Sequence, residues 1–281
     1  MEHFDRYNNL PVIGPDWDDT PWFICFSTVS YVDGEAQNYK KDNCEENRRA
    51  LNRLIKIDNV EWITLNHGNN VITVPPEKKP CRLNDGSDSL SEEDESEFAD
   101  TSKIDDPSEF ADAAIVAAKG YGAAITTADC LPVVLVSPWS DTIAIVHAGW
   151  KGVVNGVVEK TINEMSFYKD FVLKDLRIWI GPSVRDDYEI REDVRSELLN
   201  SPNVSESHFV AINDEQYLVD LPGILIEKLE AIGIERSQVE VCPESTIKSE
   251  RFFSVRREGA DTGRFATIVA IRDSVSRGDS K

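Results

Sequence analysis

Two histidines and one cysteine in this sequence have the types and positions to hold a single metal ion. The chain contains only four histidines, and two of them, His67 and His147, each follow an apolar stretch and precede a small residue. Cys130 directly precedes another apolar stretch. One thiolate and two imidazoles resemble the three-ligand set of a catalytic zinc ion, whose fourth position is kept for water or substrate.

A predicted hairpin places Cys130 close to His147. The β-rich runs 131–137 and 142–147 flank a Pro-Trp-Ser-Asp turn at 138–141. Cys130 then lies within about two residues of the position opposite His147, where cross-strand neighbours are roughly 5–8 Å apart. His67 could close the site from another strand. On spacing alone, a buried structural cysteine and hydrogen-bonded structural histidines are open alternatives.

The remaining pattern predicts an α+β fold that would position these residues. Helical spacing of apolar residues is found at 44–57, 153–165, 191–199 and 223–231. Strands are expected at 22–29, 62–65, 71–74, 113–118, 123–127, 176–180, 239–242, 252–256 and 265–271, besides the hairpin. Because strict βαβ alternation is missing, we expect one mixed-sheet domain over residues 1–281 rather than a doubly wound sheet.

The composition restricts the compartment and the partners. The chain has 281 residues, of which 41% are hydrophobic, and its formal net charge is −21. Such an acidic surface repels phosphate backbones and anionic lipid, so we expect neither a nucleic-acid nor a membrane partner. We find no secretory signal pattern, and the five cysteines contain no C-x-x-C pair, so a cytoplasmic protein is expected. The oligomeric state is not predicted.

One acidic segment carries almost half of the charge. Residues 85–109 contain eleven acidic residues and one basic residue. The segment is rich in Ser and Asp and lacks periodic apolar residues, so we interpret 80–107 as a disordered surface insertion.

Longer motifs resemble those of the YfiH/YlmD family, also called the laccase-domain or multicopper polyphenol oxidase family. The specific pair is T-A-D-C-L-P at 127–132 with H-A-G-W-K-G at 147–152. Further matches are N-H-G at 66–68, A-D-A at 111–113, I-G-P-S at 180–183, Y-E at 188–189, F-F-S-V-R-R at 252–257 and T-G-R at 262–264. Together the motifs run from about residue 22 to 271, nearly the whole chain.

The resemblance implies a fold of the CNF1/YfiH-like type and a zinc ion held by His67, Cys130 and His147. It also implies a zinc-dependent purine nucleoside enzyme, with purine nucleoside and phosphate as its small-molecule partners. The implied reactions are phosphorolysis of adenosine, inosine, guanosine or methylthioadenosine, and deamination of adenosine. Zinc lowers the pKa of bound water, which suits attack at C6 of adenine.

The other candidate residues surround these ligands in the motifs. Phosphorolysis needs cations around phosphate, and Lys151, Arg257 and Arg264 are the candidates. Asp129, beside Cys130, is a catalytic candidate for proton transfer or for orienting the ligand, with a turn or capping role as the alternative.

Two details bear on the phosphate site. The family element S-T-R-x-G-G reads S-T-V-S-Y-V at 27–32, so Val29 stands where the family has an arginine that would suit phosphate. In the expected strand 252–256, alternation would direct only one of Arg256 and Arg257 into the cleft.

Three other functions are weighed against this hypothesis. Copper oxidation of phenols needs on the order of ten histidine ligands, against four histidines here, so copper is the less favoured metal. A cysteine hydrolase would use Cys130 as nucleophile and His147 as base. An interaction protein that has lost its activity is the third alternative.

Overall fold

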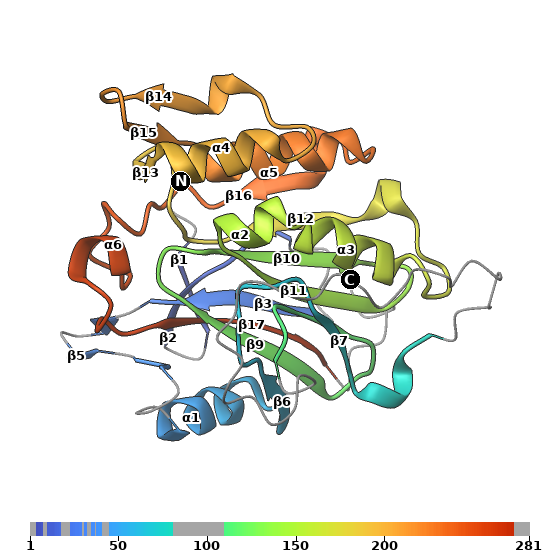
Figure 1. Ribbon diagram of the computed structural model, residues 1–281. Helices are drawn as coiled ribbons and strands as arrows, with labels where there is room; N and C mark the ends of the chain where they lie inside the picture. Colours follow the sequence, from blue (N-terminus) through green and yellow to red (C-terminus); the bar gives the residue numbers. More distant parts are fainter. Residues whose placement is uncertain are drawn as a thin grey trace, which may run out of the picture.

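Two sheets packed face to face form the centre of the fold (Figure 1). The structure is a computed structural model that describes residues 4–7, 10–17, 23–29, 31–32, 35–36, 38–40, 45–80 and 110–272. The expected insertion at 80–107 lies, except for its first residue, outside the described residues.

The first sheet, sheet 1, joins distant parts of the chain. In spatial order its strands are β1 (Phe4–Tyr7), β2 (Leu10–Ile13), β3 (Phe23–Thr28), β17 (Phe265–Ile271), β9 (Tyr121–Thr127) and β6 (Asn59–Trp62). Strand β17 pairs antiparallel with both β3 and β9, whereas β6 runs parallel to β9. The strand expected at 62–65 thus lies earlier in the chain, and it ends at Trp62.

The second sheet, sheet 2, carries the predicted hairpin at its centre. In spatial order its strands are β16 (Val239–Val241), β12 (Arg177–Ile180), β10 (Leu131–Ser137), β11 (Thr142–Ala148), β8 (Ala113–Val116) and β7 (Val71–Val74). Both sheets contain parallel and antiparallel pairs. The prediction of an α+β fold with mixed sheets is therefore confirmed.

Helices cover the outer faces of the two sheets (Figure 1). Helix α1 (Glu45–Ile55) buries Leu51 and Ile55 against sheet 1. The outer face of sheet 2 is covered by α3 (Val157–Met165), α4 (Glu192–Asn200) and α5 (Leu221–Ala231). The remaining described strands form two small sheets. One contains β13 (Tyr188–Arg191), β15 (Gln216–Val219) and β14 (Phe209–Ala211), and the other contains β4 (Tyr31–Val32) and β5 (Glu35–Ala36). Across these ranges no helix is both long and apolar enough to cross a membrane.

The central hairpin is buried on both faces, which explains its continuous apolar sequence. Every residue of β10 and β11 is buried. Leu131, Val133 and Leu135 pack toward the helices, whereas Val134 and Val136 pack toward sheet 1. Because side chains alternate along a strand, the two faces of β10 enter two different cores.

The helix expected at 153–165 is two helices. Helix α2 (Trp150–Val154) has Asn155 as its C-cap. Helix α3 follows after Gly156, which has a φ of 67°. A positive φ costs glycine little and other residues more, so Gly156 permits the chain to change direction here.

The prediction of a strand at 252–256 is wrong, because a short helix, α6 (Val255–Glu258), begins there. The Ser254 hydroxyl accepts a hydrogen bond from the Arg257 backbone N–H at 3.1 Å. Asp129, far away in the sequence, accepts one from the Arg256 backbone N–H at 2.7 Å. These two caps satisfy N–H groups that a helix leaves unpaired in its first turn.

We expect Leu135→Ala to destabilise the protein through the hairpin core. Leu135 is fully buried, so the lost contacts and the remaining cavity should lower the free energy of unfolding by about 2–5 kcal/mol. Val210→Ala is the control, because Val210 is 62% exposed and should change that free energy by less than about 0.5 kcal/mol. Denaturant unfolding of both variants measures the difference, and equal midpoints would contradict the assigned burial.

Candidate metal centre

The three predicted ligands come together at one end of the hairpin. The ligand atoms of His67, Cys130 and His147 all lie within 4.8 Å of one another, and the described residues contain no other group of this kind. The two imidazole rings meet edge to face, with centroids 4.8 Å apart. His147 is buried, Cys130 is half-buried and His67 is exposed, so the group is open to solvent on the His67 side.

Strand register explains why Cys130 meets His147. Pro132 pairs with His147 and Leu131 with Ala148, so Cys130 extends one residue beyond the end of the ladder. Side chains two positions apart share a face, which puts Cys130 on the face of Pro132 and therefore beside His147. The predicted proximity of Cys130 and His147 is thus confirmed by the register.

Asp112, which the sequence reasoning did not single out, orients both histidines. Its carboxylate is fully buried and lies 2.8 Å from Nδ1 of His147. The same carboxylate accepts hydrogen bonds from the backbone N–H groups of His67 at 3.0 Å and Gly68 at 2.7 Å. Its bond to Nδ1 leaves Nε2 of His147 as the nitrogen available to a metal. An aspartate directly before a fully apolar strand was the signal in the sequence.

The surroundings of the site shift the pKa values of the two histidines in opposite directions. Burial opposes protonation of His147, but its interactions with Cys130 and its hydrogen bond to Asp112 prevail and raise its pKa to about 9. Burial, the neighbouring His147, Lys151 and Arg264 all lower the pKa of His67, against the opposite effect of Asp112. Although burial acts to raise it, the pKa of Asp112 is lowered by its bonds to His147 and to the backbone.

The backbone beside the site leaves room for the ligand atoms. A Cβ at Gly149 would lie 3.1 Å from Sγ of Cys130 and 3.5 Å from Nδ1 of His67. The absence of a side chain at this position therefore keeps space beside two of the three ligands. His67 itself has a φ of 61°, an uncommon conformation that its buried neighbour Asp112 holds through the His67 N–H.

Asp129 has both carboxylate oxygens in structural hydrogen bonds. One oxygen accepts from the Thr246 hydroxyl and the other from the Arg256 backbone N–H, each at 2.7 Å. Its backbone carbonyl accepts from the N–H of Val184 at 3.0 Å, and its φ is 102°. These contacts favour the orienting and capping roles over proton transfer, since they tie the residue before Cys130 to three other segments.

The predicted cations divide into two groups. Lys151 and Arg264 are near enough to His67 for their charges to lower its pKa. Arg257 instead directs its guanidinium at the backbone carbonyls of a loop, including those of Thr246 and Phe252, and pairs with Glu258. Arg257 therefore acts as a structural clamp here, whereas Lys151 and Arg264 remain at the metal centre.

The structure also gives the positions of Arg256 and of Val29, which stands where the family has an arginine. Arg256 stacks on the ring of Tyr188 at 4.8 Å, and Tyr188 is near enough to Cys130 to feel its charge. Of the two arginines, Arg256 is therefore the one on the Cys130 side. Its direction is set by a helix and not by strand alternation. Val29 is 4% exposed and packs in the core between the sheets.

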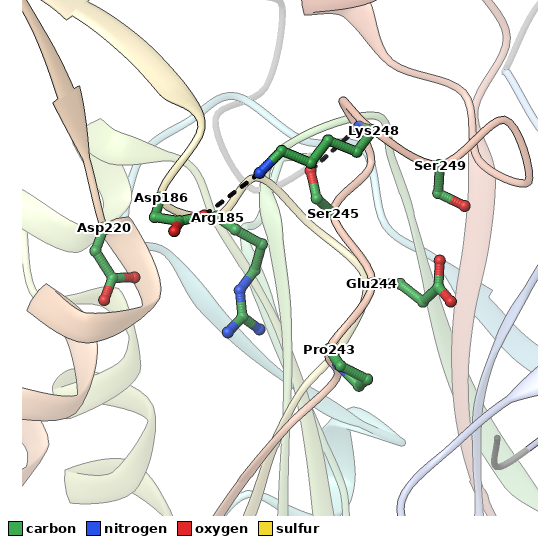
Figure 2. A pocket seen from close by; sticks show the side chains of 8 residues that line it. All are labelled: Arg185, Asp186, Asp220, Pro243, Glu244, Ser245, Lys248 and Ser249. Atoms are coloured by element: carbon green, nitrogen blue, oxygen red, sulfur yellow. Dashed lines mark hydrogen bonds and ion pairs between the residues drawn. The ribbon is translucent and has the colours of Figure 1, made fainter. Parts of the chain in front are cut away.

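A polar cleft lies behind the segments that hold Asp129. Two adjoining hollows of about 510 Å³ each share Arg185 and Asp220 as lining residues. Figure 2 shows the side chain of Arg185 between Asp220 and Pro243, with Lys248 paired to Asp186 at 3.7 Å. None of the three candidate metal ligands lines this cleft, so we assign the chemistry to the metal centre.

Comparison with known proteins places the chain in a family. The family described as multi-copper polyphenol oxidoreductase laccase matches residues 32–272. The chain belongs to this laccase-like YfiH/YlmD family. Two solved family structures share the fold. YlmD from Geobacillus stearothermophilus has a TM-score of 0.77 at 19% identity, covering 97% of this chain and 100% of that one. YfiH from Bacillus licheniformis has a TM-score of 0.74 at 20% identity, covering 94% and 96%.

Curated relatives from this family carry the name purine nucleoside phosphorylase. The protein SA1030 of Staphylococcus aureus is 31% identical over 143 residues, which are 50% of this chain and 53% of that protein. The Xylella fastidiosa protein is 32% identical over 162 residues, or 57% and 60%. The Staphylococcus saprophyticus protein is 24% identical over 247 residues, or 87% and 84%. The chain thus spans little more than half the length of the first two relatives.

We expect Asp112→Asn to weaken metal binding. The substitution removes the negative charge and turns an amide toward N–H groups that need an acceptor, so affinity for zinc should fall about 10- to 100-fold. Asp175→Asn is the matched control, because that carboxylate bonds the exposed Trp139 indole instead. Competition with a chromophoric chelator measures both affinities. Equal affinities would show that Asp112 does not support the metal ligands.

Metal affinity should rise with pH across the neutral range. In the metal-free protein His147 has a pKa of about 9, so at pH 7 a proton occupies the imidazole that the metal requires. Each metal ion bound below pH 9 must release that proton, so the association constant should increase by up to about 10-fold per pH unit between pH 6.5 and 8.5. Chelator competition at several pH values tests this, and a flat profile would contradict it.

Proposed function

We propose that this protein is a zinc-dependent purine nucleoside enzyme. The proposed reactions are phosphorolysis of adenosine, inosine, guanosine or methylthioadenosine, and deamination of adenosine. The observation that carries the proposal is the convergence of His67, Cys130 and His147 within 4.8 Å, on a side of the hairpin that is open to solvent. The names of the curated relatives supply the substrate class.

The donor set fits a zinc ion. One sulfur and two imidazole nitrogens suit zinc, and tetrahedral bonds of about 2.0–2.3 Å place ligand atoms roughly 3.5 Å apart. Three atoms within 4.8 Å need only a small closure to reach that spacing, and the exposed His67 has room to move. The buried Asp112 completes the carboxylate–histidine pair that accompanies many zinc sites. Copper is the less favoured ion because the whole chain offers four histidines.

The chain's own residues have distinct tasks in this proposal. His67, Cys130 and His147 would hold the ion, which supplies Lewis-acid chemistry when it is bound. Lys151 and Arg264 contribute positive charge beside His67 and can hold an anionic substrate within an otherwise acidic protein. Asp129 fixes the backbone that presents Cys130.

A cysteine hydrolase is the second candidate, because one observation favours it. Cys130 and His147 interact, and His147 is bonded to Asp112 at 2.8 Å, which is the order of groups in a Cys-His-Asp nucleophilic array. His67 has no task in that array, whereas it completes the metal site. The convergence of His67 on the same point therefore favours zinc.

We expect Cys130→Ser to remove both the metal and the activity. The protein purified without chelator should contain about one zinc per chain, and loss of the soft thiolate should abolish that content. Cys25→Ser is the control, because Cys25 lies in β3 and joins no cluster of metal ligands within the part of the chain that the structure describes. Elemental analysis and chromatography of products from adenosine provide the two measurements.

The products distinguish the proposed reactions. Adenine formed only with phosphate indicates phosphorolysis, and inosine formed without phosphate indicates deamination. An active protein that contains no metal, and that loses activity in Cys130→Ser, would instead establish the cysteine hydrolase. If the zinc-containing protein forms neither adenine nor inosine, the protein has lost both of the proposed activities.

A further inference from the structure

Arg256 and Tyr188 form a stacked pair at the edge of the metal centre. The guanidinium carbon of Arg256 lies 4.8 Å from the centroid of the Tyr188 ring. We propose that this pair is the oxyanion-binding element of the site, in which Arg256 contacts inorganic phosphate and Tyr188 positions the guanidinium. This inference rests on the proposed function, because it names the residue that would bind the second substrate.

The pair is attached to the metal centre through Asp129. The carboxylate of Asp129 accepts the Arg256 backbone N–H at 2.7 Å, and Asp129 directly precedes the ligand Cys130. Tyr188 begins β13, and the charges of Cys130 and Asp129 both act on its hydroxyl. Two independent segments, β13 and α6, therefore bring the stacked pair to the Cys130 side of the site.

The guanidinium of Arg256 is available, in contrast to that of its neighbour. Arg257 donates to four loop carbonyls and pairs with Glu258, so its hydrogen-bond donors are used within the protein. Apart from Tyr188, the described residues offer the Arg256 side chain no partner, and Arg256 is exposed. An arginine has five N–H donors in a planar fork, so the ring contact and the hydrogen bond to the Tyr188 hydroxyl leave most of the donors open.

Stacking prepares this arginine to bind an anion. A guanidinium held on an aromatic face loses less conformational freedom when it binds a ligand than a mobile side chain would. Arg264, which feels the charges of Cys130 and Asp129, and Lys151 beside His67 add positive charge around the same centre. In a chain of net charge −21, this local group of cations fits a small, doubly charged tetrahedral oxyanion.

That chemistry has two possible sources, inorganic phosphate and the phosphate ester of a nucleotide. We assign inorganic phosphate, because the ligand of the proposed reaction is a nucleoside and brings no phosphate of its own. Binding of a nucleoside monophosphate therefore serves as a separate arm of the test.

The test compares Arg256→Ala, Arg256→Lys, Tyr188→Phe and Tyr188→Leu with Arg53→Ala. Arg53 is an exposed arginine in the last turn of α1, so its replacement changes the net charge equally, away from the site. One readout is calorimetric titration of the zinc-loaded protein with inorganic phosphate and, separately, with adenosine monophosphate. The other is the pair of KM values for phosphate and nucleoside in phosphorolysis.

We expect Arg256→Ala to weaken phosphate binding by roughly 10- to 100-fold and to raise the KM for phosphate similarly, with little change in the KM for nucleoside. Arg256→Lys should recover only part of the loss, because lysine lacks the fork. Tyr188→Phe keeps the ring and loses only the hydroxyl that is hydrogen-bonded to the Arg256 side chain, so its phosphate binding should fall less than that of Tyr188→Leu. Zinc content should be unchanged in all of them.

The outcomes separate this inference from the proposed function. Weaker phosphate binding in Arg256→Ala but not in Arg53→Ala supports the assignment, even if the wild type converts no nucleoside and the proposed function fails. Active phosphorolysis with an unchanged KM for phosphate in Arg256→Ala overturns the assignment alone. A wild type that does not bind phosphate, or a variant that loses only nucleotide binding, also overturns it.

Discussion

A buried carboxylate organises the candidate metal centre of this protein. Asp112 is fully enclosed, and ionised carboxylates are costly to bury unless hydrogen-bond donors surround them. The donors here are the imidazole of His147 and the backbone N–H groups of His67 and Gly68. Because these three donors offset the cost of burying the charge, the interactions that satisfy Asp112 also hold the two candidate metal-binding histidines in position.

The central hairpin and its consequences could be predicted from the sequence. Two runs of β-branched and apolar residues joined by a short turn predict a hairpin centred on that turn, and the observed register puts Cys130 beside His147. The mixed α+β class also followed from local patterns. His67 was different, because no local rule brings a residue between β6 and β7 to the hairpin. Its residue type made it a possible third ligand, and the family resemblance supplied the reason to include it.

What the sequence could not supply are contacts between segments far apart in the chain. The helix α6 exists partly because Asp129 caps it across 127 positions of sequence, and a strand was expected there instead. In this capped helix two adjacent arginines have different partners. Arg257 donates to loop carbonyls, and Arg256 stacks on Tyr188. Propensity and alternation describe neighbours along the chain, so they carry no information about such a cap.

Two of the three candidate ligands also lie where the chain passes between the two sheets. His67 is on the connection from β6 of sheet 1 to β7 of sheet 2, and Cys130 is on the connection from β9 of sheet 1 to β10 of sheet 2. His147 belongs to β11, within sheet 2. An ion shared by these residues would be a cross-link between the layers of the fold. By mass action, the stability of the whole protein would then follow the concentration of free metal, and metal supply would govern its abundance as well as its chemistry.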